Sequence, residues 1–102
     1  MDLAFESTDL EAVCTQDRVA RKKYDAAMVK GLQRRIKQIQ AAVDVQELLD
    51  GLGKWHWLGA QFPDCLGGHI TGNWRLIVRP DGAGPKDPTA KSVRAVEIID
   101  YH

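Results

Sequence analysis

The chain has 102 residues, of which 44% are hydrophobic and 27% charged, and its formal net charge is zero. This size predicts one small domain over residues 1–102, with one modest core. The balanced charge argues against a generic nucleic-acid binder, and no apolar run reaches the roughly 20 residues of a membrane span. The charge is unevenly spread, however: residues 1–17 carry five acids and no bases, and residues 18–37 carry eight bases and one acid.

The first half of the chain has helical patterns after a short strand at residues 3–5. Thr8-Asp9-Leu10-Glu11 is a capping-box sequence, which predicts a helix over residues 9–24. A second helix is predicted over residues 26–42, because apolar side chains recur there every three or four residues. These are Met28, Leu32, Ile36, Ile39 and Val43. Asp44 is expected to cap a further helical turn over residues 45–49.

The second half of the chain has strand patterns after the break at Gly51-Leu52-Gly53. Strands are predicted over residues 65–71, 74–79 and 93–101, and the Pro- and Gly-containing residues 80–92 are expected to form a long hairpin loop. Helices followed by hairpin-connected strands predict an α+β fold. In it, two N-terminal helices pack on one face of a small antiparallel sheet.

The two cysteines, Cys14 and Cys65, lack the spacing of metal ligands. One disulfide is possible, but reduced thiols in the cytosol are the favoured interpretation. The N-terminus has neither the basic nor the apolar region of an export signal. We therefore expect a cytoplasmic protein without metal or cofactor.

The end of the last predicted strand, Asp100-Tyr101-His102, carries groups that suit proton transfer. Strand alternation places Val96, Ile98, Asp100 and His102 on one face and Tyr101 on the other. A histidine with an ordinary pKa near 6.5 can exchange protons at neutral pH, and the adjacent aspartate would raise that pKa. The alternative is a strand end that is merely solvated.

Arg75 follows Trp74 on the preceding predicted strand and shares a strand face with Arg79. A guanidinium matches phosphate oxygens in a bidentate fork, so this face is a candidate anion site. The alternative is a surface arginine stacked on an indole.

Two further segments have both a structural and a functional interpretation. His56 lies between Trp55 and Trp57, and a hydrophobic clamp is favoured there over stacking of RNA bases. Lys30, Arg34 and Lys37 follow one face of the second helix, which is either simply solvated or tracks a nucleic-acid backbone. His69, after Gly67-Gly68, is interpreted as structural.

Motifs along nearly the whole chain resemble those of the HigB-type killer toxins of the RelE/ParE superfamily. They are Phe5, Asp9-Leu10-Glu11, the basic helix with Leu32, Arg35-Ile36, Ile39 and Ala42, the Val45 to Leu48 turn, His56-x-Leu58, Asn73-Trp74-Arg75-Leu76 and the closing Val96-Glu97-Ile98-Ile99-Asp100-Tyr101-His102. The terminal Asp-Tyr-His together with the Trp-Arg strand is the more specific part.

The resemblance implies the toxin of a type II toxin–antitoxin pair, with a RelE-like fold. Such toxins enter the ribosomal A site and cleave mRNA without metal, by attack of the 2′-hydroxyl on the neighbouring phosphate. A HigA-type helix-turn-helix antitoxin is the implied partner, besides the ribosome and mRNA. Carried over by position, the implied catalytic residues are His56, Arg75, Asp100, Tyr101 and His102, and Lys30, Arg34, Lys37 and Arg79 are candidate RNA contacts.

One stretch departs from the family pattern and leaves two alternatives open. Family members commonly have a polar-Gly-Asp-Arg sequence after the His-x-Leu element, whereas this chain has Gly59-Ala60-Gln61-Phe62. A cation expected near the phosphate is therefore missing. The first alternative is a non-catalytic RelE-fold protein that acts by binding its antitoxin. The second is a ParE-like inhibitor of gyrase.

Overall fold

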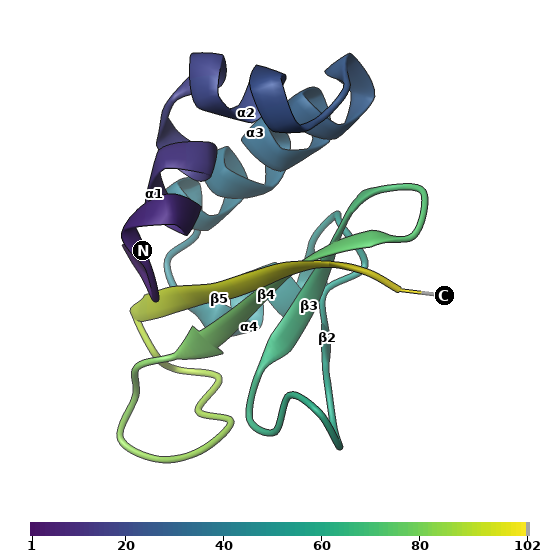
Figure 1. The fold of residues 1–102 in the computed structure, drawn as a ribbon. Coiled ribbons are helices and arrows are strands. Elements are labelled where there is room, and N and C mark those ends of the chain that lie inside the picture. Colours follow the sequence, from purple (N-terminus) through teal and green to yellow (C-terminus); the bar gives the residue numbers. More distant parts are fainter. Residues whose placement is uncertain (102) are drawn as a thin grey trace.

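The computed structural model describes residues 1–101, in which helices precede strands except for one short strand at the start (Figure 1). The elements are β1 (Asp2–Phe5), α1 (Thr8–Thr15), α2 (Asp17–Lys23), α3 (Ala26–Ala41), α4 (Val45–Asp50), β2 (His56–Trp57), β3 (Leu66–Thr71), β4 (Trp74–Pro80) and β5 (Ser92–Asp100). None of the helices in this part of the chain is both long and apolar enough to cross a membrane.

The five strands form one sheet in the order β1-β5-β4-β3-β2. β3, β4 and β5 pair antiparallel, as predicted, and β2 adds to β3 in the same way, but β1 pairs parallel to β5, so the sheet is mixed. A parallel pair needs a long connection, and the whole chain between β1 and β5 supplies it. The α+β class is confirmed, whereas the two-residue β2 was not predicted.

The predicted first helix is in fact two helices that meet at Gln16. The backbone of Gln16 is extended, with φ −124° and ψ 107°, and its N–H closes α1 by donating to Ala12. The second predicted helix is confirmed as α3, which begins at an Asp25 carboxylate that accepts a bond from the Met28 N–H at 2.9 Å. Val43 is 63% exposed rather than buried, because α3 ends before it and Asp44 starts α4.

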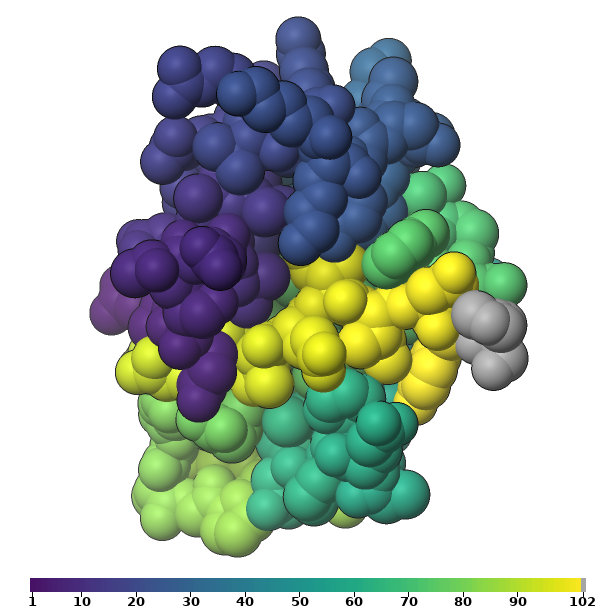
Figure 2. Space-filling view, viewed as in Figure 1, coloured from purple at the N-terminus to yellow at the C-terminus, as the bar shows by residue number. Residues whose placement is uncertain are grey.

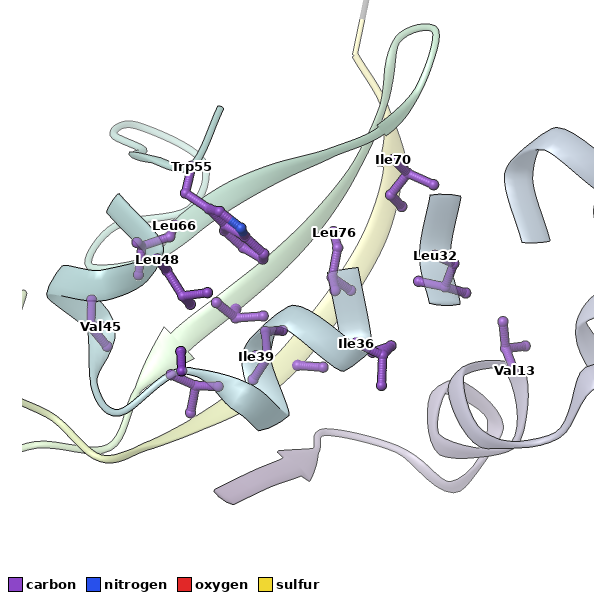
Figure 3. Packing of buried hydrophobic residues seen from close by; sticks show 14 of the residues in the cluster. Val13, Leu32, Ile36, Ile39, Val45, Leu48, Trp55, Leu66, Ile70 and Leu76 are labelled. Atoms are coloured by element: carbon purple, nitrogen blue, oxygen red, sulfur yellow. The ribbon is translucent and has the colours of Figure 1, made fainter. Parts of the chain in front are cut away.

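The main core lies between the helices and one face of the sheet, which we call the inner face (Figure 3). Its fully buried side chains include Met28, Leu32, Ile39, Leu48, Leu66, Leu76, Val78 and Val93. α3 approaches β3 closely at Gly31, where a Cβ atom would overlap the carbonyl oxygen of Ile70. Glycine at this position therefore sets the separation between helix and sheet.

A smaller apolar cluster lies on the opposite, outer face of the sheet. It consists of buried Leu58, Cys65 and Ile77, with Phe62, Val96 and Ile99 packed against them. Cys14 packs against the inner cluster, so the two free thiols lie on opposite faces and cannot pair with each other.

A β-bulge in β5 changes which side chains share a face. Ile77 pairs with Glu97 and Val78 with Ala95, so Val96 is one extra residue in β5. Val96 packs on the outer face, whereas Ile98 packs against the inner core. The prediction that Val96 and Ile98 share a face is therefore wrong.

Candidate functional site

Three nitrogen-bearing side chains lie near one another at one side of the sheet, and we call them the outer row: Lys54, His69 and Arg75. His69 of β3 pairs with Arg75 of β4. The N–H of His69 also donates to the Gly53 carbonyl at 2.8 Å. Gly53 directly precedes Lys54, and Lys54 lies close enough to His69 for its charge to lower the pKa of the imidazole. The row therefore gathers residues from two neighbouring strands and from the loop before β2.

The loop that carries Lys54 is fixed to α3 through the Gln38 side chain. Its Oε1 accepts bonds from Arg35 Nη1 at 2.9 Å and Trp55 Nε1 at 3.0 Å, and its Nε2 donates to the Leu52 carbonyl at 2.6 Å. Gly53 has φ +96°, and the Arg35 guanidinium occupies the space of its missing Cβ. The loop thus takes a backbone shape that favours glycine at this point.

Trp55 is a structural clamp, as the favoured interpretation predicted. Its ring is 4% exposed and packs in the inner core (Figure 3). Trp57 is half-buried against the same core. Stacking of RNA bases on Trp55 is therefore excluded in this structure.

Arg75 is held at the turn between β3 and β4. Its Nη1 donates to the Gly72 carbonyl at 3.1 Å and to its neighbour's carbonyl, that of Trp74, at 3.0 Å. A guanidinium has five N–H donors, so two bonds on one nitrogen leave capacity for a phosphate. Arg75 is half-buried, which keeps the charge at the surface and accessible to an anion.

His69 was interpreted as structural, but its neighbours give it the character of a functional group. Burial lowers its pKa, and the positive charges of Arg75, Lys54 and Arg35 lower it further, while a backbone hydrogen bond with Gly72 opposes them. The neutral imidazole is therefore favoured at neutral pH. Lys54 and His69 are the two site residues that sequence reasoning missed.

The other predicted catalytic residues are not all brought together. His56 is exposed on the outer face, with Nδ1 2.9 Å from the Lys54 carbonyl oxygen, but it lies two strands away from Arg75. Tyr101 is 42% exposed, and its N–H donates to the Asn73 carbonyl at 2.8 Å, close to Arg75 in the same turn. His102 lies outside the described residues.

Asp100 lies on the inner side of β5. It pairs with Trp74, whose ring meets the edge of Tyr24 in the helical layer at 5.5 Å between centroids. Arg75, the next residue along β4, faces the opposite way. The structure therefore does not place Asp100 on the face of the outer row.

The predicted anion site of Arg75 and Arg79 is divided. The two arginines share the outer face, as predicted, but four strand residues separate them by about 13 Å. Arg79 instead pairs with Glu6 at 3.7 Å, and Arg94 lies 3.9 Å from the same carboxylate. Arg79 therefore belongs to a separate ion-pair cluster.

The basic residues of α3 lie in the helical layer. Lys30, Arg34 and Lys37 are all exposed on α3, which packs against the inner face of the sheet. The sheet separates them from the outer row, so their contact with RNA stays a prediction. Among residues 1–101, no three His, Cys, Asp or Glu side chains gather closely enough to hold a metal ion.

Comparison with known proteins gives a structural likeness without a sequence match. No family model and no curated protein matches the sequence. A YoeB/ParE toxin from Agrobacterium tumefaciens superposes with a TM-score of 0.66 and 18% identity, with 100% of both chains covered. The chain has the fold of this toxin.

Two structures from Staphylococcus aureus are also similar, a YoeB–YefM complex and a YoeB dimer. Their TM-scores are 0.63 and 0.62, at 18% and 19% sequence identity. Each superposition covers 100% of this chain and 97% of the YoeB chain. This likeness confirms the RelE-like α+β fold that the sequence motifs implied. Identity at this level shows the fold alone.

Proposed function

We propose that this chain is the toxin of a type II toxin–antitoxin system, of the HigB type within the RelE/ParE superfamily. Its activity is ribosome-dependent, metal-independent cleavage of mRNA. The observation that carries the proposal is Arg75 on the outer face, at one end of the outer row and paired with His69, in a chain with the fold of a YoeB/ParE toxin. Such a row suits a phosphodiester, because cations stabilise the charge that develops on phosphorus.

In the proposed reaction, the 2′-hydroxyl attacks the adjacent phosphate and the 5′-oxygen leaves. Arg75 neutralises charge on the scissile phosphate, and His102 gives a proton to the leaving oxygen. Tyr101, beside the turn that holds Arg75, is a further hydrogen-bond donor. His56 contacts RNA from the exposed edge of the same face. Asp100 acts on His102 rather than on the phosphate.

Lys54 supports the nuclease over the non-catalytic alternative. That alternative rested on the missing cation at residues 59–62. In the structure Lys54 lies close enough to His69 for its positive charge to lower the pKa of the imidazole. A second cation besides Arg75 thus acts on His69, and it comes from a different position in the sequence than residues 59–62.

The antitoxin partner has a candidate docking edge on β5. β1 pairs with only Ser92 to Ala95, and within residues 1–101 no strand pairs with β5 on that side beyond Ala95. Figure 2 shows this part of β5 uncovered between the helices and the other strands. A groove of about 340 Å³ beside it is lined by apolar and aromatic side chains, by Lys23 on the side of α2, and by Asp9 and Glu97.

We assign this edge to an extended acidic segment of a HigA-type helix-turn-helix antitoxin. A free strand edge binds an extended peptide through main-chain hydrogen bonds. The cationic α2 beside the groove, with Arg18, Arg21, Lys22 and Lys23, attracts an acidic one. Co-expression with the neighbouring gene product, followed by size exclusion, tests the partnership. Separate elution at micromolar concentration would contradict it.

Induced expression without an antitoxin tests the activity. We expect growth arrest with cuts in translated mRNA, mapped by primer extension. Arg75→Ala should lower cleavage about 10²–10³-fold, and His102→Ala about 10²–10⁴-fold. Arg75→Lys should retain part of the activity, since a point charge only partly replaces the planar fork. All variants are compared at matched soluble levels.

The same experiment separates the alternatives. A block of translation by puromycin should abolish the cuts, and cleavage of naked RNA would contradict the need for a ribosome. Soluble protein without toxicity would favour the non-catalytic antitoxin-binding protein. Arrest with DNA breaks and intact mRNA would favour the gyrase inhibitor.

A further inference from the structure

We propose that His69 is a further catalytic residue of this site: the proton acceptor that activates the 2′-hydroxyl, between Lys54 and Arg75 as phosphate-binding cations. The inference rests on the proposed function, because it assigns a role within the same reaction. It differs from the motif-based set of site residues, in which neither Lys54 nor His69 appears.

The placement of His69 satisfies the geometry that such a role requires. Directly paired residues on neighbouring antiparallel strands have Cβ atoms about 4.5–5.5 Å apart, and His69 is directly paired with Arg75. Arg75 Nη1 also donates to the Gly72 carbonyl at 3.1 Å, and the backbone of Gly72 acts to raise the pKa of His69, so both side chains lie at the same turn. One phosphodiester can therefore contact the guanidinium while the ribose hydroxyl next to it contacts the imidazole.

The surrounding charges keep His69 in the form that can accept a proton. Arg75 from β4, Lys54 from the loop before β2 and Arg35 from α3 all lower its pKa, in addition to burial. A bound phosphate would cancel part of this positive charge and so raise the pKa of His69. The imidazole is thus neutral before RNA binds and becomes a stronger base once the phosphate is in place.

The attack of the 2′-hydroxyl needs one proton acceptor and one proton donor, which His69 and His102 supply. The ribose O–H bond breaks and its proton goes to His69, while a bond forms between the 2′-oxygen and phosphorus. The bond between phosphorus and the 5′-oxygen breaks, and that oxygen takes a proton from His102. The products are a 2′,3′-cyclic phosphate and a free 5′-hydroxyl, with no change of oxidation state.

Single-turnover cleavage of mRNA on purified ribosomes tests the inference. His69→Gln and His69→Asn should each lower the chemical rate about 10²–10⁴-fold and leave toxin binding to the ribosome nearly unchanged. Thr71→Ser, on the same strand but paired with Trp74, is the matched control and should cleave at the normal rate. Folding of each variant is checked by circular dichroism.

The pH profile and chemical rescue distinguish a proton acceptor from a structural residue. The wild-type rate should rise with pH through the pKa that His69 has in the bound complex, and the His69 variants should lose this rise. Added imidazole should restore cleavage by His69→Ala but not by Arg75→Ala. Full activity of His69→Gln would overturn the role of His69 but not the proposed function. Weaker binding of this variant to the ribosome, with an unchanged cleavage rate, would do the same. A wild-type chain that cleaves no mRNA would overturn the proposed function itself.

Discussion

The two faces of the sheet contain different kinds of side chain, and β4 shows the contrast within a single strand. Its inward residues Leu76 and Val78 are fully buried under the helices. Two of its outward residues, Arg75 and Arg79, are only half-buried and charged. The inner face therefore holds the fold together, and the outer face is available for chemistry. Substitutions at adjacent positions of β4 should therefore differ in effect: one should lower stability and the other should lower activity.

The largest stability effect is expected for Leu76→Ala, immediately beside Arg75. Removing a fully buried leucine side chain loses transfer energy and leaves a cavity, which costs about 2–5 kcal/mol. Arg75→Ala should change the free energy of unfolding by about 1 kcal/mol or less, since it is a half-buried surface group. Urea unfolding of the purified variants measures both. Equal losses from the two substitutions would contradict the division between the faces.

A second effect on the inner face is expected at Gly31, where α3 meets β3. Gly31→Ala introduces a methyl group into the space of the Ile70 carbonyl, and the rigid backbone on both sides cannot yield cheaply. We expect a loss of about 1–3 kcal/mol, although alanine is the better helix former. Thermal unfolding measures it. Unchanged or increased stability would show that the separation of α3 and β3 is not fixed at this residue.

Much of the fold could be predicted because its signals are local. The stripe along α3, the capping residue Asp44, and the apolar runs of β3 to β5 each lie within one short segment. The parallel pairing of β1 with β5 could not be predicted, since it joins the two ends of the chain. The break at Gln16 was missed because Thr15-Gln16-Asp17-Arg18 contains neither proline nor glycine.

The candidate site was harder to predict because it depends on register. Gly72-Asn73 predicts a two-residue turn, and a regular hairpin around it would place Ile70 opposite Arg75. The structure has an irregularity between His69 and Thr71 that brings His69 there instead. Lys54 joins the row only through the packing of its loop against Gln38. Neither feature has a signal within a single segment.

The Gln38 side chain connects α3, on the inner face, to the loop that carries Lys54, and its substitution tests this connection. Gln38→Ala removes the acceptor of Trp55 Nε1 and the donor to the Leu52 carbonyl, so the free energy of unfolding should fall by about 1–2 kcal/mol. The loop with Lys54 would also lose its anchor, and cleavage should fall more than stability predicts. Tryptophan fluorescence and the ribosome assay measure the two effects. Gln40→Ala, exposed on the same helix, is the control, and equal behaviour of the two variants would contradict the role of Gln38.

The smallest effect is expected in the loop between β4 and β5, which belongs to neither face. The exposed Asp87 carboxylate accepts bonds from the Ala83 N–H at 3.0 Å and from the N–H and hydroxyl of Thr89 at 2.9 and 2.7 Å. These bonds lower the pKa of Asp87 below its ordinary 3.8. A carboxylate with a lowered folded-state pKa stabilises the fold above pH 3.8, and this contribution is lost as the pH falls through the folded-state pKa. Asp87→Asn should therefore lower Tm slightly at pH 7, with a difference from wild type that shrinks below pH 3.8 and disappears once the pH is below the folded-state pKa. Calorimetry from pH 2 to 7, about the range over which a carboxylate titrates, measures this, with Asp81→Asn in the same loop as the control. A difference that persists in acid would show that Asp87 acts through the shape of the loop rather than through its charge.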